Sequence, residues 1–290
     1  MVTPVRGVCC TDMIESDPWC ALFDSSSPTV MGVLNVTPDS FSDGGRFSSL
    51  SAACDQALQL FEDGAGIVDI GGESTRPGAL PVSSQEELDR VIPVIEAVRR
   101  ESDGFLSVDT SNPVVMRAAV SAGANMINDV RALTRPGALA EAVDLSVPVC
   151  LMHMQGSPGD MQDAPKYASV VEEVMQFLSE RKKECVEAGL AESNIILDPG
   201  FGFGKTLEHN LDLLANLSQL RQLGSPVLVG VSRKSMFGQL LGRPVEERLA
   251  GTVAATVIAV QQGCAVIRVH DVKESVDAIK LVLATRRGLQ

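Results

Sequence analysis

The sequence is poor in aromatic residues and in basic ones. Aromatics make up only 4% of its 290 residues, with one Trp and one Tyr, whereas 45% of all residues are hydrophobic. The core must therefore be aliphatic, as it is in parallel sheets wrapped in helices. Lysine and arginine number 24 against 37 aspartates and glutamates, which gives a net charge of −13. This deficit argues against a nucleic-acid partner, whose phosphates demand a basic surface.

Long apolar runs and paired cysteines are also missing. No apolar run approaches the roughly 20 residues of a membrane span, so we expect no association with a membrane. The first 28 residues lack a continuous apolar segment, so we expect no signal peptide. The seven cysteines include no C-x-x-C pair and no histidine at zinc spacing. A reducing cytoplasm is therefore the expected location.

What the sequence does contain is one plan repeated eight times, a short apolar run followed by a helix-like segment. Strands are predicted at 30–35, 66–71, 105–109, 125–129, 148–152, 195–198, 226–231 and 264–269. Helices are predicted at 49–63, 84–101, 113–122, 136–145, 167–189, 207–222, 245–262 and 272–285. Strict alternation of this kind indicates an α/β protein with a parallel sheet.

Two topologies satisfy this alternation. An open, doubly wound sheet is one, but eight units in roughly 260 residues favour closure into a TIM (β/α)8 barrel. There is no low-complexity linker, so we expect a single barrel domain over 26–290. Residues 1–25 should form a short irregular extension, partly disordered.

Polar residues stand where the predicted strands end. A single acid there could be a helix cap, but eight polar ends are harder to explain structurally, because the carboxyl ends of barrel strands share one face, where barrel enzymes keep their chemistry. These residues are Asn35, Glu73, Arg76, Asp109, Asn128, Asp129, His153, Asp198, Ser232, Arg233, Lys234, Arg268 and His270. The sequence therefore predicts one site at this face.

The residue types indicate its chemistry. Asp109, Asn128 and Asp198 are rich in acceptors and suit a heterocycle with a guanidine-like N–H edge. A second set is cationic or potentially cationic and suits phosphate oxygens, namely Lys234, Arg268, Arg76 and His270. With no Ser-His-Asp triad and no cysteine nucleophile in view, substitution at a carbon bearing a diphosphate fits better than hydrolysis.

One further strand end suggests a metal ion. Asn35 supplies a neutral oxygen, a modest ligand for Mg²⁺, which usually binds through few protein groups together with substrate phosphates. An acidic chain that binds an anionic substrate needs such an ion or a local concentration of cations.

A tempting motif and two histidines carry less weight. The segment 200–205 resembles a nucleotide-binding loop, but its first glycine comes one residue too late, because position 199 is proline. It can still form a turn near the site, with Phe203 exposed as a stacking surface. His209 is expected at the surface, and His153 is expected to face the site.

Eight blocks, in order along 31–271, resemble the dihydropteroate synthase family of pterin-binding enzymes. They are 34–45 (LNVTPDSFSDGG), 69–78 (DIGGESTRPG), 107–110 (SVDT), 127–129 (IND), 151–156 (LMHMQG), 197–205 (LDPGFGFGK), 232–235 (SRKS) and 268–271 (RVHD). The resemblance implies condensation of 6-hydroxymethyl-7,8-dihydropterin diphosphate with 4-aminobenzoate, giving 7,8-dihydropteroate and diphosphate in folate biosynthesis.

The resemblance also implies residue roles and partners. The pterin would be held by Asp109, Asn128, Asp198, Lys234 and Arg268, of which all but Asn128 are also expected to be catalytic. The diphosphate would be bound by Asn35 with Mg²⁺ and by Arg76, Arg268 and His270. The aminobenzoate pocket would comprise Thr75, Pro77, Phe203, Lys234 and Ser235. The family usually forms homodimers through barrel helices.

Two alternatives remain at the level of sequence. A pterin-dependent methyltransferase on the same barrel would not need Arg76 and Lys234 for an aminobenzoate pocket. A non-catalytic paralogue would bind pterin without turnover. Nothing looks inserted in 73–78, so sulfonamides are expected to compete with aminobenzoate.

Overall fold

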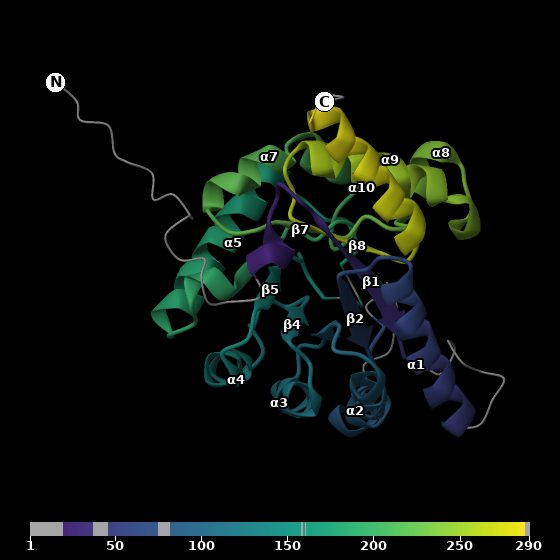
Figure 1. Cartoon of the computed structure of the whole chain (residues 1–290). Helices are drawn as coiled ribbons and strands as arrows, with labels where there is room; N and C mark the ends of the chain where they lie inside the picture. Colours follow the sequence, from purple (N-terminus) through teal and green to yellow (C-terminus); the bar gives the residue numbers. More distant parts are fainter. Residues whose placement is uncertain (1–19, 37–45, 75–81, 158, 160, 288–290) are drawn as a thin grey trace.

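The computed structural model describes residues 20–36, 46–74, 82–157, 159 and 161–287. Eight strands form one parallel sheet in the order β6-β5-β4-β3-β2-β1-β8-β7. An isolated parallel bridge between Leu197 and Val227 joins its two edges, so the sheet nearly closes into the expected TIM barrel (Figure 1). The strands are β1 Thr29–Asn35, β2 Ile67–Gly71, β3 Phe105–Asp109, β4 Met126–Asp129, β5 Val149–Met152, β6 Ile195–Asp198, β7 Leu228–Val229 and β8 Val266–Val269.

Helices surround this barrel (Figure 1). They are α1 Arg46–Glu62, α2 Ser84–Glu101, α3 Pro113–Ala122, α4 Ala138–Leu145, α5 Val170–Glu187, α6 Leu207–Ala215, α7 Leu217–Leu220, α8 Ser235–Leu241, α9 Leu249–Gln261 and α10 Val272–Arg287. Among the described residues there are also short 3₁₀ helices, η2 Cys20–Phe23, η4 Glu192–Asn194, η5 Arg221–Leu223 and η6 Val245–Glu247.

Three predicted elements differ from the structure. The helix expected at 207–222 breaks at Asn216, whose side chain donates to the carbonyl and the carboxylate of Asp212. The strand expected at 226–231 is short, because a turn with Arg233 at a φ of 56° soon follows it. The helix expected at 245–262 begins with η6 and continues as α9, and α8 precedes both without having been predicted.

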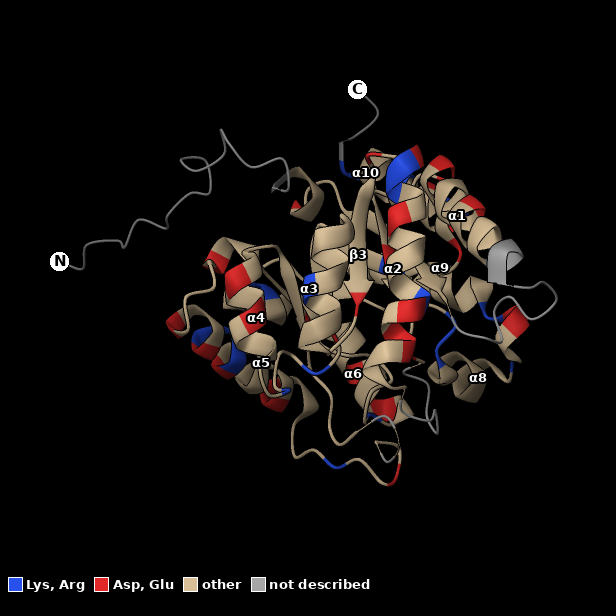
Figure 2. Ribbon diagram, turned by 90° about the horizontal axis from the view of Figure 1, so that it is seen from below, with Lys and Arg blue, Asp and Glu red and all other residues tan. Residues whose placement is uncertain are grey.

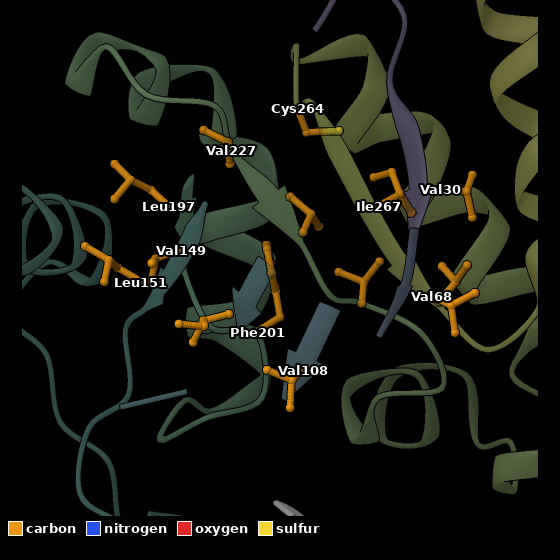
Figure 3. Close-up of a cluster of buried hydrophobic side chains, with 14 of the residues drawn as sticks. Val30, Val68, Val108, Val149, Leu151, Leu197, Phe201, Val227, Cys264 and Ile267 are labelled. Carbon is orange, nitrogen blue, oxygen red and sulfur yellow. The ribbon is translucent and has the colours of Figure 1, made fainter. Parts of the chain in front are cut away.

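Side chains alternate between the two faces of each strand. The outward set is apolar and packs against the helices; Figure 3 shows part of this layer, including Val30, Val68, Val108 and Ile267. At the amino-terminal ends of the strands the inward set is apolar too, and forms a separate cluster in the barrel. It comprises Met31, Ile67, Phe105, Met126, Cys150, Ile196, Leu228, Ala265 and Val266.

The chain entering β1 closes this floor of the barrel. Leu22 and Phe23 of η2 pack against the inner cluster, and the Phe23 ring meets that of Phe105 edge to face, with centroids 6.2 Å apart. The extension expected at 1–25 otherwise lies largely outside the described residues, so its boundary with the domain at 26–290 stays a prediction.

Within the described part of the chain, no helix is both long enough and apolar enough to cross a membrane. Cys150 and Cys264 are buried free thiols, as expected for small apolar residues in a core.

The first turn of α2 offers a test of local stability. Ser83 accepts from the backbone N–H of Glu86 at 3.3 Å, and Glu86 accepts from the backbone N–H of Ser83 at 3.1 Å, which completes a capping box. We predict that Ser83→Ala lowers the free energy of unfolding by about 1 kcal/mol, because it removes the cap acceptor. Urea denaturation followed by circular dichroism measures this.

The matched control is Ser169→Ala at the start of α5. Ser169 occupies the same N-cap position, but its side chain makes no capping hydrogen bond. This variant should unfold within about 0.5 kcal/mol of the parent. Equal losses in the two variants would show that the hydrogen bond in α2 does not stabilise that helix.

Candidate active site

Several of the predicted site residues lie at the carboxyl-terminal end of the barrel because of the strand register. Asn35 pairs with Gly71, Gly71 with Asp109, and Asp109 with Asn128, so these four positions lie at one level around the barrel. Asn35 and Asp109 stand an even number of residues after the inward-facing Met31 and Phe105, so they share the inner face. Inward positions are therefore apolar at the floor and polar at the mouth.

An arginine between two carboxylates organises this mouth. The Arg268 guanidinium on β8 donates from Nε to Asp69 Oδ2 at 2.7 Å and from Nη2 to Asp109 Oδ2 at 2.9 Å. Asp69 is completely buried, and its Oδ1 has no hydrogen-bond partner among the described residues. Burial opposes the charged form of Arg268, but the Asp69 and Asp109 carboxylates outweigh it and raise the pKa of the guanidinium.

Asp109 and Asn128 present acceptor atoms to the interior of the mouth. Burial raises the pKa of Asp109 to about 7, against the effect of Arg268 and with a contribution from the Asp69 carboxylate. Asn128 donates from Nδ2 to Asp69 Oδ2 at 2.9 Å. Because this bond fixes the orientation of the amide, the side-chain oxygen of Asn128 is left to accept from a ligand.

Asp198 at the end of β6 and Lys234 after β7 add a carboxylate and an ammonium to the mouth. Asp198 is buried at the end of β6 and accepts from the backbone N–H of Gly200 at 2.7 Å. Burial raises its pKa, opposed by that N–H, by Lys234 and by Lys205. Burial also lowers the pKa of Lys234 to about 8, although Asp198 opposes this. The Asp198 carboxylate therefore lies close enough to the Lys234 ammonium to stabilise its charge.

Phe203 was expected to be exposed, and that expectation is wrong. Only 8% of its surface is accessible, because the ring packs in an apolar cluster with Met152 and Met161. Lys234 also lies over the ring, with Nζ 4.3 Å from the ring centroid. This cation–π contact joins the loop after β6 to the loop after β7. Ser235, the first residue of α8, is exposed beside it in sequence.

His270 follows β8 and is held by Ser232. Its backbone N–H donates to Ser232 Oγ at 3.1 Å, and its Nδ1 lies 3.0 Å from the same oxygen. Burial, together with Arg268 and Arg233, lowers the pKa of His270 to about 4. The imidazole is therefore neutral at pH 7, and it can offer a phosphate a hydrogen bond but not a charge.

The chemistry of the donor set fits a magnesium ion bound largely by its substrate. Asn35 is half-buried at the mouth. Within the described ranges, no group of three or more His, Cys, Asp or Glu side chains is placed to hold a metal ion. An ion here would take one oxygen from Asn35 and the rest from phosphate and water, which is the usual arrangement for Mg²⁺.

Some predicted residues lie outside the described part, and two functional candidates were missed. Thr75, Arg76 and Pro77 fall in the undescribed range 75–81. Asp69 was missed although it stands two residues before the end of β2, on the inner face. Lys205 was missed because its loop resembled a nucleotide-binding motif; it is buried next to His153, with Nζ 2.9 Å from Nδ1 of that ring.

The structure shows the surroundings of the two histidines. Burial and the nearby Lys205 lower the pKa of His153 to about 3, so its ring is neutral. His209 was expected at the surface but is half-buried. Its ring packs edge to face on Tyr167 with centroids 4.9 Å apart, and its Nδ1 accepts from the backbone N–H of Thr206 at 3.2 Å.

Comparison with known proteins agrees with this geometry. The family model described as pterin binding enzyme matches residues 31–270. The dihydropteroate synthase of Escherichia coli strain K12 is 55% identical over 262 residues, covering 90% of this chain and 93% of that protein.

Solved structures give the same result. A Yersinia pestis dihydropteroate synthase in a sulfonamide drug complex superposes with a TM-score of 0.87 at 54% identity, over 91% of this chain and 96% of that one. A Xanthomonas albilineans dihydropteroate synthase with 4-aminobenzoic acid gives 0.86 at 53% identity, over 91% and 95%. The chain therefore belongs to the dihydropteroate synthase family of pterin-binding enzymes.

Proposed function

We propose that this protein is a dihydropteroate synthase, a transferase of folate biosynthesis. It condenses 6-hydroxymethyl-7,8-dihydropterin diphosphate with 4-aminobenzoate to give 7,8-dihydropteroate and diphosphate. The observation that carries this proposal is the mouth itself, where Asp109, Asn128 and Asp198 present acceptors beside Arg268 and Lys234. The two substrates are small molecules. Their binding needs both the acceptors and the cations of this set.

The acceptors would hold the pterin. Its N–H edge offers adjacent donors, which match the carboxylates of Asp109 and Asp198 and the free amide oxygen of Asn128. Arg268 is fixed by Asp69 and Asp109, and its planar guanidinium suits stacking on the face of the ring. Lys234 would complete this set from the other side.

The cationic side chains of the mouth would bind the diphosphate. Arg268 and Lys234 supply charge, neutral His270 supplies a hydrogen bond, and Arg76 would add a second guanidinium. Asn35 would hold Mg²⁺ together with the diphosphate, as its place at the mouth suggests. When bound, the ion would neutralise charge on the leaving group.

The aminobenzoate would bind between two loops. Phe203 offers a ring, Lys234 a cation, and Ser235 a hydroxyl and a helix-initial backbone N–H. Thr75 and Pro77 would complete the pocket. The Xanthomonas relative holds 4-aminobenzoic acid, which supports such a pocket in this family.

The geometry suits a largely dissociative substitution. As diphosphate leaves, positive charge develops on the exocyclic methylene and spreads over the electron-rich pterin. The Asp109 and Asp198 carboxylates favour this charge, while Arg268 and Lys234 favour the departing anion. The arylamine then attacks as the neutral amine that it is at pH 7, so the reaction needs no strong general base.

A homodimer through barrel helices is also proposed. The helices α8, α9 and α10 lie near one another on one side of the barrel (Figure 1), and α9 contains no charged residue. This side carries a set of exposed apolar side chains, here called the apolar patch. The patch consists of the exposed side chains of Leu240, Leu241, Val245, Leu249, Ile258 and Leu281. Exposed apolar side chains gathered on neighbouring helices are typical of an interface, and a second copy is the partner the family suggests. A cytoplasmic location is proposed from the free thiols.

The reaction is tested by diphosphate release from purified protein with dihydropterin diphosphate and Mg²⁺, with and without 4-aminobenzoate. We predict that dihydropteroate forms only when aminobenzoate is present. Lys234→Ala should lower the rate about 100-fold, because it removes a cation that stabilises the leaving group. The control Lys183→Ala removes an exposed lysine on α5, paired only with Glu187 at 3.7 Å, and should leave the rate unchanged.

Other outcomes would identify another function. Pterin binding without diphosphate release would indicate a non-catalytic paralogue, and absence of pterin binding would refute the whole site. In the same assay sulfonamides should inhibit, and rising aminobenzoate should relieve the inhibition. Inhibition independent of aminobenzoate would contradict the proposed pocket.

The dimer is tested by sedimentation velocity. We predict that the parent protein sediments as a dimer and that Ile258→Asp sediments as a monomer, because a buried unpaired carboxylate destabilises an apolar interface. Val114→Asp is the matched control, since Val114 is also apolar and exposed, with 57% of its surface accessible against 39% for Ile258, but lies on α3, away from the patch. A monomeric parent, or dissociation of both variants, would argue against this interface.

A further inference from the structure

The glycine-rich segment Gly200–Lys205 has a structural arrangement unlike that of a phosphate-binding loop. Gly200, Gly202 and Gly204 all have positive φ. A Cβ on Gly200 would lie 1.9 Å from the carbonyl oxygen of His153, and one on Gly204 would lie 2.4 Å from that of Gln155. Glycine is therefore required at both positions, so that the loop after β6 packs directly on the loop after β5.

Lys205 is the centre of this loop. Its ammonium donates to the carbonyl oxygens of Gly200 at 2.9 Å and of Phe203 at 3.0 Å, and Nζ lies 2.9 Å from His153 Nδ1. An ammonium has three N–H donors, so these three acceptors satisfy it fully. The low pKa of His153 keeps that ring neutral and able to accept.

The contacts of Lys205 leave its ammonium no N–H group to donate to a substrate at the mouth. Only 3% of its surface is accessible, and burial lowers the pKa of its ammonium to about 7, opposed by Asp198. A buried lysine is costly, and it is tolerated here because every donor has a partner and Asp198 supplies nearby charge. Such a lysine holds other groups in place.

What the loop positions is the Phe203–Lys234 contact. Lys205 binds the carbonyl of Phe203, and the Phe203 ring lies under the Lys234 ammonium. The Lys234 chain also runs close to the loop backbone, since a Cβ on Gly202 would lie 3.1 Å from Lys234 Cδ. Movement of this loop would therefore displace both residues.

Further side chains hold the same loop from outside. Tyr167 Oη donates to the carbonyl of Gly204 at 2.8 Å. Asn210 Oδ1 accepts from the backbone N–H of Gly202 at 2.8 Å, and Gln162 Nε2 donates to the carbonyl of that glycine at 2.6 Å. By contrast, Arg268, Asp69, Asp109 and Asn128 form their own network on other strands.

We propose that Lys205 is a positioning residue for the aminobenzoate half of the site, which fixes the Gly200–Phe203 backbone and thereby the Phe203 ring beside Lys234. This inference rests on the proposed synthase function. It assigns no contact with substrate to Lys205. It predicts that loss of the ammonium affects aminobenzoate more than pterin.

The test compares Lys205→Met with the parent protein. Steady-state kinetics gives KM for 4-aminobenzoate, and calorimetry gives the Kd of dihydropterin diphosphate. We expect the aminobenzoate KM to rise about tenfold, the equivalent of about 1.4 kcal/mol. The pterin Kd should change less than threefold, the small change reflecting the charge that Lys205 places near Asp198.

Two further variants separate positioning from charge and from misfolding. Tyr167→Phe removes an uncharged contact to the same loop, and it should raise the aminobenzoate KM about threefold with no change in pterin Kd. Lys182→Met is the matched control, because Lys182 Nζ donates to the backbone carbonyl of Leu223 at 2.7 Å, far along the chain from the loop. It should alter neither constant.

Failure of this inference and failure of the proposed function would give different results. An unchanged aminobenzoate KM in Lys205→Met and Tyr167→Phe would overturn the proposal. So would an equal loss for both substrates in Lys205→Met, which would place its effect on Asp198 instead. If the parent protein forms no dihydropteroate, the proposed function fails, whereas normal turnover in the parent with unaltered variants refutes only this inference.

Discussion

The mouth of the barrel depends on one ion-paired arginine. Arg268 on β8 joins Asp69 on β2 and Asp109 on β3, two neighbouring strands that β1 separates from β8 in the sheet. Removing one partner of a buried pair leaves an uncompensated charge, which typically costs about 3–5 kcal/mol. The same bonds orient the guanidinium, and Asp69 also orients the amide of Asn128. The side chains of Arg268, Asp109 and Asn128 are thus oriented before a substrate binds, which lowers the free-energy cost of binding.

This polar mouth and an apolar floor lie at different heights along the same inward-facing positions of the barrel. Inward positions carry Met31, Ile67 and Phe105 at one end and Asp69, Asp109 and Arg268 at the other. The acidic residues of the chain are spread over the outer helices (Figure 2). The cationic side chains of Arg268 and Lys234 are buried in the mouth. Because local charge in a low-dielectric cleft governs binding, a chain of net charge −13 is compatible with an anionic substrate.

Sequence patterns predicted the barrel because buried parallel strands are continuous apolar runs, and all of them end on one face. They did not predict α8, since Lys234 at its N-cap makes no capping hydrogen bond and Gly238 interrupts its pattern. Asp69 was missed because it lies inside a strand and not at its end. The burial of Phe203 depends on residues of other loops, such as Met161 and Lys234. The acceptors of Lys205 are backbone carbonyls and a histidine, so no residue pattern encodes either arrangement.

Asp69 acts on the substrate through Arg268, whose guanidinium it orients. The most direct measurement is calorimetric binding of dihydropterin diphosphate to Asp69→Asn, to Arg268→Gln and to the double variant. If the bridge is one unit, Asp69→Asn should weaken binding about tenfold in the parent protein and less than twofold when Arg268 is already replaced, since interacting residues are not additive. The same loss in both backgrounds would contradict the claim and show that Asp69 contributes to binding independently of the arginine.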